Sequence, residues 1–153
     1  MDVRLINPFI NSTINVLETM AFITVNAGKP YVKTDNLATG DVSGVLGLTG
    51  VANGTIAVTF EKECILKVVS NMFGETMSEL NHEIADAVGE LTNMISGQAR
   101  RELEEIGKVF KAAIPSVVMG NNHSIVHYTD GPKIAIPFST NAGEFTIEVC
   151  FER

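Results

Sequence analysis

Three polar side chains at helical spacing are the residues of this sequence whose types and positions could do chemistry. Asp86, Glu90 and Asn93 stand at i, i+4 and i+7 of a run with the pattern of a helix interior. At 100° per residue, Glu90 lies about 40° from Asp86 and Asn93 about 20° to the other side. The apolar residues cluster near the opposite pole, so the polar trio faces outward: Ile84, Val88, Leu91 and Ile95.

The chemistry that these groups offer is positioning. An amide is no useful general base, but its donor and acceptor ends can orient a water molecule. A carboxylate beside the amide can anchor a cationic group on a partner. The pair suits a hydrolytic water held on a phosphoryl group whose metal and charge stabilisation come from elsewhere.

The flanking glycines argue against a merely solvated helix surface, which is the commonest reason for an exposed polar face. Gly89 and Gly97 flank the trio, and each costs a helix about 1 kcal/mol relative to alanine. Small residues there would leave the Glu90 and Asn93 side chains accessible to a partner's backbone. Close packing within the fold is the other explanation that the sequence leaves open.

The elements that must position these side chains follow from the hydrophobic pattern. Asn7-Pro8 predicts the start of a first helix, and residues 61–73 have helical periodicity before Gly74. The capping-box form of Thr76-Met77-Ser78-Glu79 predicts the start of the longest helix, which extends to Ile106 and carries the trio. Strand patterns cover residues 21–26, 30–34, 41–50 and 55–60, and then 108–119, 124–128, 132–139 and 143–152.

Both halves of the chain therefore consist of helix followed by strands, which predicts an internal duplication. The two pseudo-repeats span about residues 7–74 and 76–153, with Gly54 and Gly143 at equivalent turns. Under this alignment Glu90 and Asn93 fall on Asn15 and Glu18, so the first copy has the two side-chain types in reversed order. We expect a single α+β domain over residues 1–153, with two long helices on a mainly antiparallel sheet and one functional copy of the motif.

The motif and the duplication together resemble the CheC/CheX family of chemotaxis phosphatases. The family signature is an acidic or Ser residue, three residues, Glu, two residues and Asn, with a proline somewhat over twenty residues later. Asp86, Glu90 and Asn93 match it, and Pro115 follows Asn93 by 22 positions. The resemblance covers the whole chain, because duplicated helix-plus-strands units are the family's plan.

The resemblance implies a phosphatase acting on the aspartyl-phosphate of CheY or a related receiver domain. Glu90 would pair with the receiver's active-site lysine, Asn93 would hold the attacking water, and Asp86 would be a supporting residue. Mg²⁺ would belong to the receiver, and this chain would bind no cofactor or metal itself. Loss of the motif in the first copy, at Asn15 and Glu18, points to the CheX type, a homodimer joined through sheet edges.

Composition and charge exclude several other classes. The net charge of −7 argues against nucleic acid, because the basic pair Arg100-Arg101 is followed at once by three glutamates. The sequence has neither a secretory signal nor a membrane anchor, so we expect a cytoplasmic protein. His123 and His127 would lie about 13 Å apart on a strand, too far for one metal ion.

The sequence leaves two rival functions open. The same fold occurs in flagellar switch proteins, so the chain could be a module that binds a receiver or a neighbouring subunit without hydrolysis. A small-molecule hydrolase using Glu90 as base is the other, and it predicts a concave pocket beside that residue.

Overall fold

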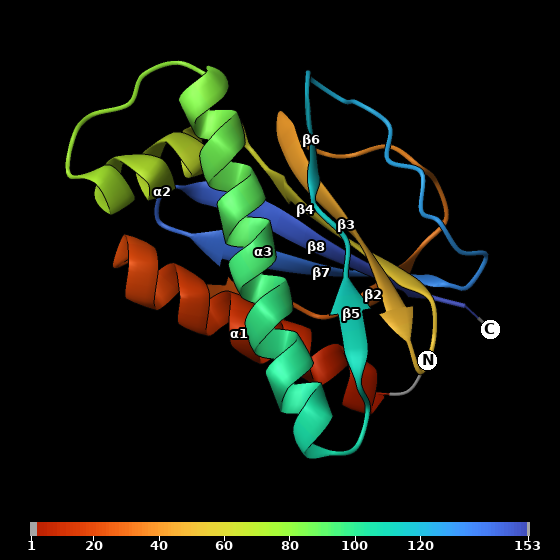
Figure 1. Cartoon of the computed structure of the whole chain (residues 1–153). Helices are drawn as coiled ribbons and strands as arrows, with labels where there is room; N and C mark the ends of the chain where they lie inside the picture. Colours follow the sequence, from red (N-terminus) through yellow and green to blue (C-terminus); the bar gives the residue numbers. More distant parts are fainter. Residues whose placement is uncertain (1–2, 153) are drawn as a thin grey trace.

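The computed structural model describes residues 3–152, in which three helices pack on one face of an eight-stranded antiparallel sheet (Figure 1). The helices are α1 (Val3–Ala21), α2 (Lys62–Phe73) and α3 (His82–Glu105). The strands are β1 (Asn26–Ala27), β2 (Tyr31–Lys33), β3 (Val42–Gly50), β4 (Gly54–Phe60), β5 (Phe110–Ala112), β6 (Ser116–Met119), β7 (Lys133–Thr140) and β8 (Gly143–Phe151). The predicted α+β class and antiparallel sheet are confirmed, with α2 as a third helix beside the two long ones.

The order of the strands is symmetrical about the junction of β8 and β4. The central path is β7, β8, β4 and β3; β1 and β2 both pair with β7, and β5 and β6 both pair with β3. Each half of the chain thus contributes one central hairpin and two short strands on the hairpin of the other half. This symmetry supports the internal duplication, which stays a prediction.

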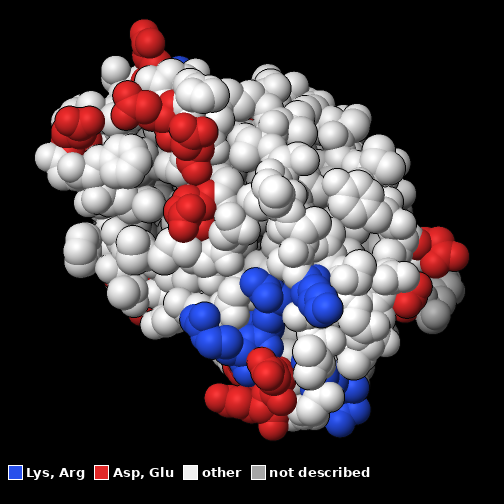
Figure 2. Space-filling model, in the orientation of Figure 1, with Lys and Arg blue, Asp and Glu red and all other residues white. Residues whose placement is uncertain are grey.

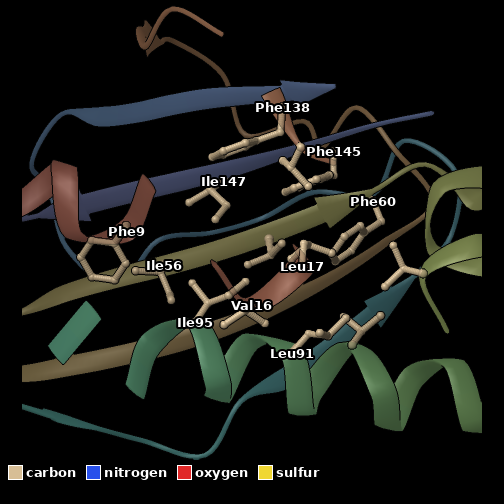
Figure 3. Close-up of a cluster of buried hydrophobic side chains, with 14 of the residues drawn as sticks. Phe9, Val16, Leu17, Ile56, Phe60, Leu91, Ile95, Phe138, Phe145 and Ile147 are labelled. Atoms are coloured by element: carbon tan, nitrogen blue, oxygen red, sulfur yellow. The ribbon is translucent and has the colours of Figure 1, made fainter. Parts of the chain in front are cut away.

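Alternating residues of the central strands form the core under the helices. Ile56 and Phe60 of β4 and Phe145 of β8 are buried against side chains of α1 and α3, such as Leu17 and Leu91 (Figure 3). The ring of Phe145 stacks on Phe138 with centroids 4.9 Å apart. Burying a large apolar side chain contributes about 1.5–3 kcal/mol, so this layer holds the helices firmly on the sheet.

The face of the sheet away from the helices carries a buried charged cluster, which we call the Glu148 cluster. Lys33 Nζ donates to Glu148 Oε2 at 2.8 Å, and His127 Nε2 lies 3.0 Å from Glu148 Oε1. Burial alone would raise the pKa of Glu148, but hydrogen bonds from His127 and Lys33 and the Lys33 charge hold that pKa below its usual value. The cluster therefore keeps an ionised carboxylate inside the protein.

Both long helices begin elsewhere than the sequence predicts. The first helix extends back to Val3, so Pro8 lies inside it. Pro8 cannot donate a backbone hydrogen bond, and the burial of Ile6 in the core offsets this loss. The capping-box prediction at residues 76–79 is wrong. The N-cap of α3 is Asn81, whose side chain accepts from the Ile84 N–H at 3.1 Å, while the Met77 N–H donates to Ser70 Oγ.

Three strand predictions also change. Residues 21–26 are mostly irregular because Ala21 ends α1 and Phe22 adopts a left-handed backbone with φ of 54°. Residues 108–119 split into β5 and β6 around Pro115, which has no N–H to pair with a neighbouring strand. Residues 124–128 form only an isolated bridge from Ser124 to Leu37. This segment lies over the face of the sheet, where Ile125 and His127 pack on it, and does not pair along an edge as a further strand.

The position of α3 depends on a glycine in β3. A Cβ atom on Gly44 would overlap the hydroxyl of Thr92 and lie 3.3 Å from a Val88 methyl group. Gly44 thus lets α3 approach the strand closely. Thr92 is buried there, and the next residue, Asn93, points about 100° further round the helix and is exposed.

Candidate functional site

The three predicted site residues lie together on the exposed face of α3. Asp86, Glu90 and Asn93 are all exposed, while Val88, Leu91 and other residues of the opposite face are fully buried. The buried face is fixed on β3 and against α1. A rigid helix therefore presents the polar trio to solvent, as its spacing predicts.

Glu90 and Asn93 have no internal partner in the described part of the chain. Within residues 3–152 their side chains make no hydrogen bond or ion pair with the rest of the chain. Asp86 Oδ1 lies 3.8 Å from His82 Nε2, and both of these side chains are largely exposed. The donors and acceptors of Glu90 and Asn93 are thus available to another molecule.

The surface around these residues is a shallow groove of about 240 Å³, which we call the Gly97 groove. It is lined by Glu90, Asn93, Met94, Gly97, Gln98 and Arg101. All six belong to α3, so within the described residues no second element lines the groove. Small-molecule sites are larger and more enclosed, and this geometry counts against the small-molecule hydrolase.

The two flanking glycines are not required by packing inside the chain. A Cβ atom on Gly89 would meet only a Val117 methyl group at 3.5 Å, and one on Gly97 would lie 3.9 Å from Arg100 Nη2. Both are ordinary contacts, in contrast to the overlap at Gly44. Of the two explanations left open by the sequence, the need for access by a partner is the one that this packing favours.

The charges on the exposed face of α3 are divided along its length. Figure 2 shows acidic side chains gathered near the upper part of the helix, basic ones farther down and further acidic ones below these. The acidic part contains Glu83, Asp86 and Glu90, and the basic part contains Arg100 and Arg101. Gly97 and Arg101 follow Asn93 by four and eight residues, so the arginine lies on the same side of α3 as the trio. Helical spacing could have identified it from the sequence, where composition led us to consider the arginines only as a possible nucleic-acid contact.

The first-copy counterparts of the motif have a different environment. Asn15 and Glu18 lie exposed on α1, but Asn15 Nδ2 donates to Gln98 Oε1 of α3 at 2.7 Å. Asn11 Nδ2 similarly donates to Glu102 Oε1 at 3.0 Å. These two contacts give α1 a polar connection to α3 beside the Gly97 groove.

Pro115 lies where the strand beside α3 is interrupted. It separates β5 from β6, and Val117 of β6 is the neighbour of Gly89 on α3. The adjoining Ile114 is 91% exposed. The proline of the predicted signature is therefore close to the helix that bears the motif, although 22 positions separate it from Asn93.

The remaining candidate residues have other partners. His123 Nε2 lies 2.6 Å from Ser43 Oγ, whereas His127 belongs to the Glu148 cluster. Within residues 3–152, no three His, Cys, Asp or Glu side chains are grouped to hold a metal ion. In the same part of the chain, every helix is too short or too polar to cross a membrane.

Comparison with known sequences identifies a family and a relative within it. Residues 42–139 match the family described as chemotaxis phosphatase CheX. The CheY-P phosphatase CheX of Thermotoga maritima is 31% identical over 145 residues, which cover 94% of this chain and 92% of the relative. The similarity thus extends over nearly the whole of both proteins.

Solved structures agree with that relationship. The chemotaxis protein CheX of Desulfovibrio desulfuricans is 54% identical, with a TM-score of 0.90 over 97% of this chain and 99% of that chain. A CheX–CheY–BeF3–Mg complex from Borrelia burgdorferi matches at 26% identity and a TM-score of 0.83, covering 97% of both chains. Thermotoga maritima FliY, at 16% identity and a TM-score of 0.67, shares the fold alone over 93% of this chain and 84% of its own.

Proposed function

The chain belongs to the CheX family of chemotaxis phosphatases, and we propose that it hydrolyses the aspartyl-phosphate of a CheY-type receiver domain through Glu90 and Asn93. The observation that carries this proposal is the pair itself. Both side chains are exposed on a rigidly packed helix and, within residues 3–152, have no partner. The groove beside them is open enough for another protein to approach.

Asn93 supplies the geometry for the attack. Its amide oxygen accepts from a water molecule and its NH₂ group donates to a phosphoryl oxygen, so the water is held in line with the bond that breaks. The water oxygen bonds to phosphorus, the bond from phosphorus to the aspartyl oxygen breaks, and the carboxylate leaves with the bonding electrons. Both protons of the attacking water end on the phosphate that is released.

Glu90 fixes the orientation of the partner. An exposed carboxylate beside the amide is suited to a charge-assisted hydrogen bond with a lysine on the receiver. Asp86, one turn earlier, would add negative charge for the same cation, in a supporting role. Mg²⁺ would be held by the receiver, where it neutralises charge on the phosphoryl oxygens.

One active motif per chain and a homodimer complete the proposal. In the first copy the two side-chain types are in reversed order, at Asn15 and Glu18. The Asn15 amide also donates to Gln98, so this donor is already used within the protein. The short strands β2 and β6 lie at the two edges of the sheet, where unpaired backbone groups favour pairing with a second copy. Light scattering tests the dimer: the expected mass is twice that of the 16.5 kDa chain.

The phosphorylated lifetime of candidate receivers tests the activity. Each receiver is phosphorylated, separated from its phosphodonor, and followed with and without the protein. Faster decay at substoichiometric protein supports a phosphatase. Binding with an unchanged decay rate would instead support the flagellar type of non-catalytic module. The same screen identifies the physiological receiver, and fractionation of the source cells tests the expected cytoplasmic location.

A further inference from the structure

Arg100 and Arg101, toward the C-terminal end of α3, have no part in the roles proposed for Glu90 and Asn93. Arg101 is exposed, and within residues 3–152 it makes no ion pair or hydrogen bond, although Glu102, Glu104 and Glu105 follow it in the sequence. A solvated helix end would be expected to pair such charges locally. Instead, Arg101 lines the Gly97 groove together with Glu90 and Asn93.

Two guanidinium groups converge above Gly97. Arg100 Nη2 lies 3.9 Å and Arg101 Nη1 4.0 Å from the position that a Cβ atom would take on this glycine. Helical side chains lean toward the N-terminus, which explains why both groups cover the preceding turn. They are therefore only one helical turn, about 6 Å along the axis, from Asn93.

Arg100 is held in place, whereas Arg101 has no hydrogen-bond or ion-pair partner among the residues that the structure describes. Arg100 Nε donates to the buried Ser96 Oγ at 3.2 Å, which fixes its guanidinium along the helix. Helix-dipole stabilisation does not explain the pair, because α3 has no basic residue in its last turn and ends with glutamates. A prepositioned positive charge beside an unpaired arginine is suited to an oxyanion of a partner.

We infer that Arg101, with Arg100 beside it, is a specificity-determining residue that binds an oxyanion of the phosphorylated receiver next to the Asn93 site. This inference rests on the proposed function of the same face. It makes the docking face bipolar: Glu90 takes a cation of the receiver, and Arg101 takes an anion about two turns away. The oxyanion is either a carboxylate at the rim of the receiver's active site or the phosphoryl group itself.

Steady-state dephosphorylation by Arg101→Gln, Arg101→Lys and wild type tests the inference. Arg101→Gln should raise KM about fivefold, as for loss of one exposed charge pair, with kcat within twofold of wild type. It should also reduce the dependence of KM on salt. Arg101→Lys keeps the charge without the planar fork and should fall between the two.

The matched control is Lys67→Gln, which removes one positive charge from the exposed surface of α2. The inference is overturned if Arg101→Gln and Lys67→Gln have equal KM values, or if Arg101→Gln lowers kcat alone. Asn93→Ala in the same assay separates the two proposals. If wild type accelerates decay and Asn93→Ala does not, the proposed function stands whatever Arg101→Gln shows.

Binding measurements distinguish the two sources of the oxyanion. The receiver is titrated with wild type and Arg101→Gln, once with Mg²⁺ alone and once with Mg²⁺ and beryllium fluoride as the phosphoryl mimic. Weakening confined to the beryllium fluoride form assigns the phosphoryl group, and equal weakening of both forms assigns a receiver carboxylate. Unaltered affinity for both forms would overturn the inference.

Discussion

Glu90 and Glu148 are the same side chain in opposite environments. Glu90 is exposed on α3 and, within residues 3–152, has no partner. Glu148 is buried on the other face of the sheet, where Lys33 and His127 satisfy both of its oxygens. The contrast separates two uses of a carboxylate: Glu148 holds the fold together, and Glu90 leaves its interactions for a partner.

Glu148→Ala should have the largest effect, and only on stability. Removing the carboxylate leaves the buried Lys33 ammonium without its counter-charge and His127 Nε2 without its hydrogen-bond partner, which costs about 3–5 kcal/mol of unfolding free energy. Urea unfolding measures the loss, with Glu144→Ala, an exposed position on the same strand, as the control. Phosphatase activity per folded molecule should be unchanged. A loss below about 1 kcal/mol, the value for an exposed pair, would contradict the role given to the cluster.

Glu90→Ala should show the reverse pattern. Because Glu90 makes no hydrogen bond or ion pair within residues 3–152, the unfolding free energy should stay within about 0.5 kcal/mol of wild type. The value of kcat/KM for receiver dephosphorylation should fall about 10- to 100-fold, because the partner's cation loses its anchor. Glu104→Ala, an exposed position on the same helix, is the control and should retain full activity. Equal activity of Glu90→Ala and Glu104→Ala would remove Glu90 from the mechanism.

Gly97→Ala should separate stability from activity within one substitution. The new methyl group meets no atom closer than 3.9 Å, so α3 should be stabilised by about 1 kcal/mol relative to glycine. The same methyl group projects into the Gly97 groove and should lower kcat/KM about threefold, a loss of well under 1.4 kcal/mol. Thermal unfolding and receiver dephosphorylation measure the two effects. A stabilised variant with full activity would mean that no partner approaches this turn closely.

The pH dependence of unfolding should show the smallest effect. Because the folded pKa of Glu148 is below its ordinary value of 4.5, its contribution to stability is complete above that pH. The contribution is lost as the pH falls through the folded pKa, since the unfolded state then binds the additional proton. Between pH 3 and 5, wild type should therefore lose more unfolding free energy than Glu148→Gln. Parallel pH profiles would show that the carboxylate is not stabilised in its ionised form.

Periodicity predicted the elements with long, regular patterns and the exposed face of α3. The spacing of Asp86, Glu90 and Asn93 alone was enough to place the trio, because a helix converts spacing directly into direction. The predicted start of α3 is wrong. Thr76-Met77-Ser78-Glu79 has the local form of a helix cap, but the hydrogen bond from the Met77 N–H to Ser70 Oγ, a tertiary contact, decides the conformation of this segment. Local pattern carries no information about that contact.

The contacts that join distant segments could not be predicted for the same reason. Lys33, His127 and Glu148 come from separate parts of the chain, and nothing in their local sequence indicates that they meet. The role of Gly44 likewise depends on which helix residue packs over it, here Thr92. Helical periodicity is enough to place Arg101 on the face of the trio. That its guanidinium group lies over Gly97 is seen only from the side-chain positions.

The most direct test of the central claim is the decay rate of the phosphorylated receiver at saturating Asn93→Ala. Alanine at this exposed position keeps the helix and every internal contact but removes the amide that holds the water. The expected result is tight binding to the receiver, through Glu90 and the rest of the face, with a decay rate equal to that of the receiver alone. Acceleration equal to that of wild type would contradict the account, because the attacking water would then be positioned by another group.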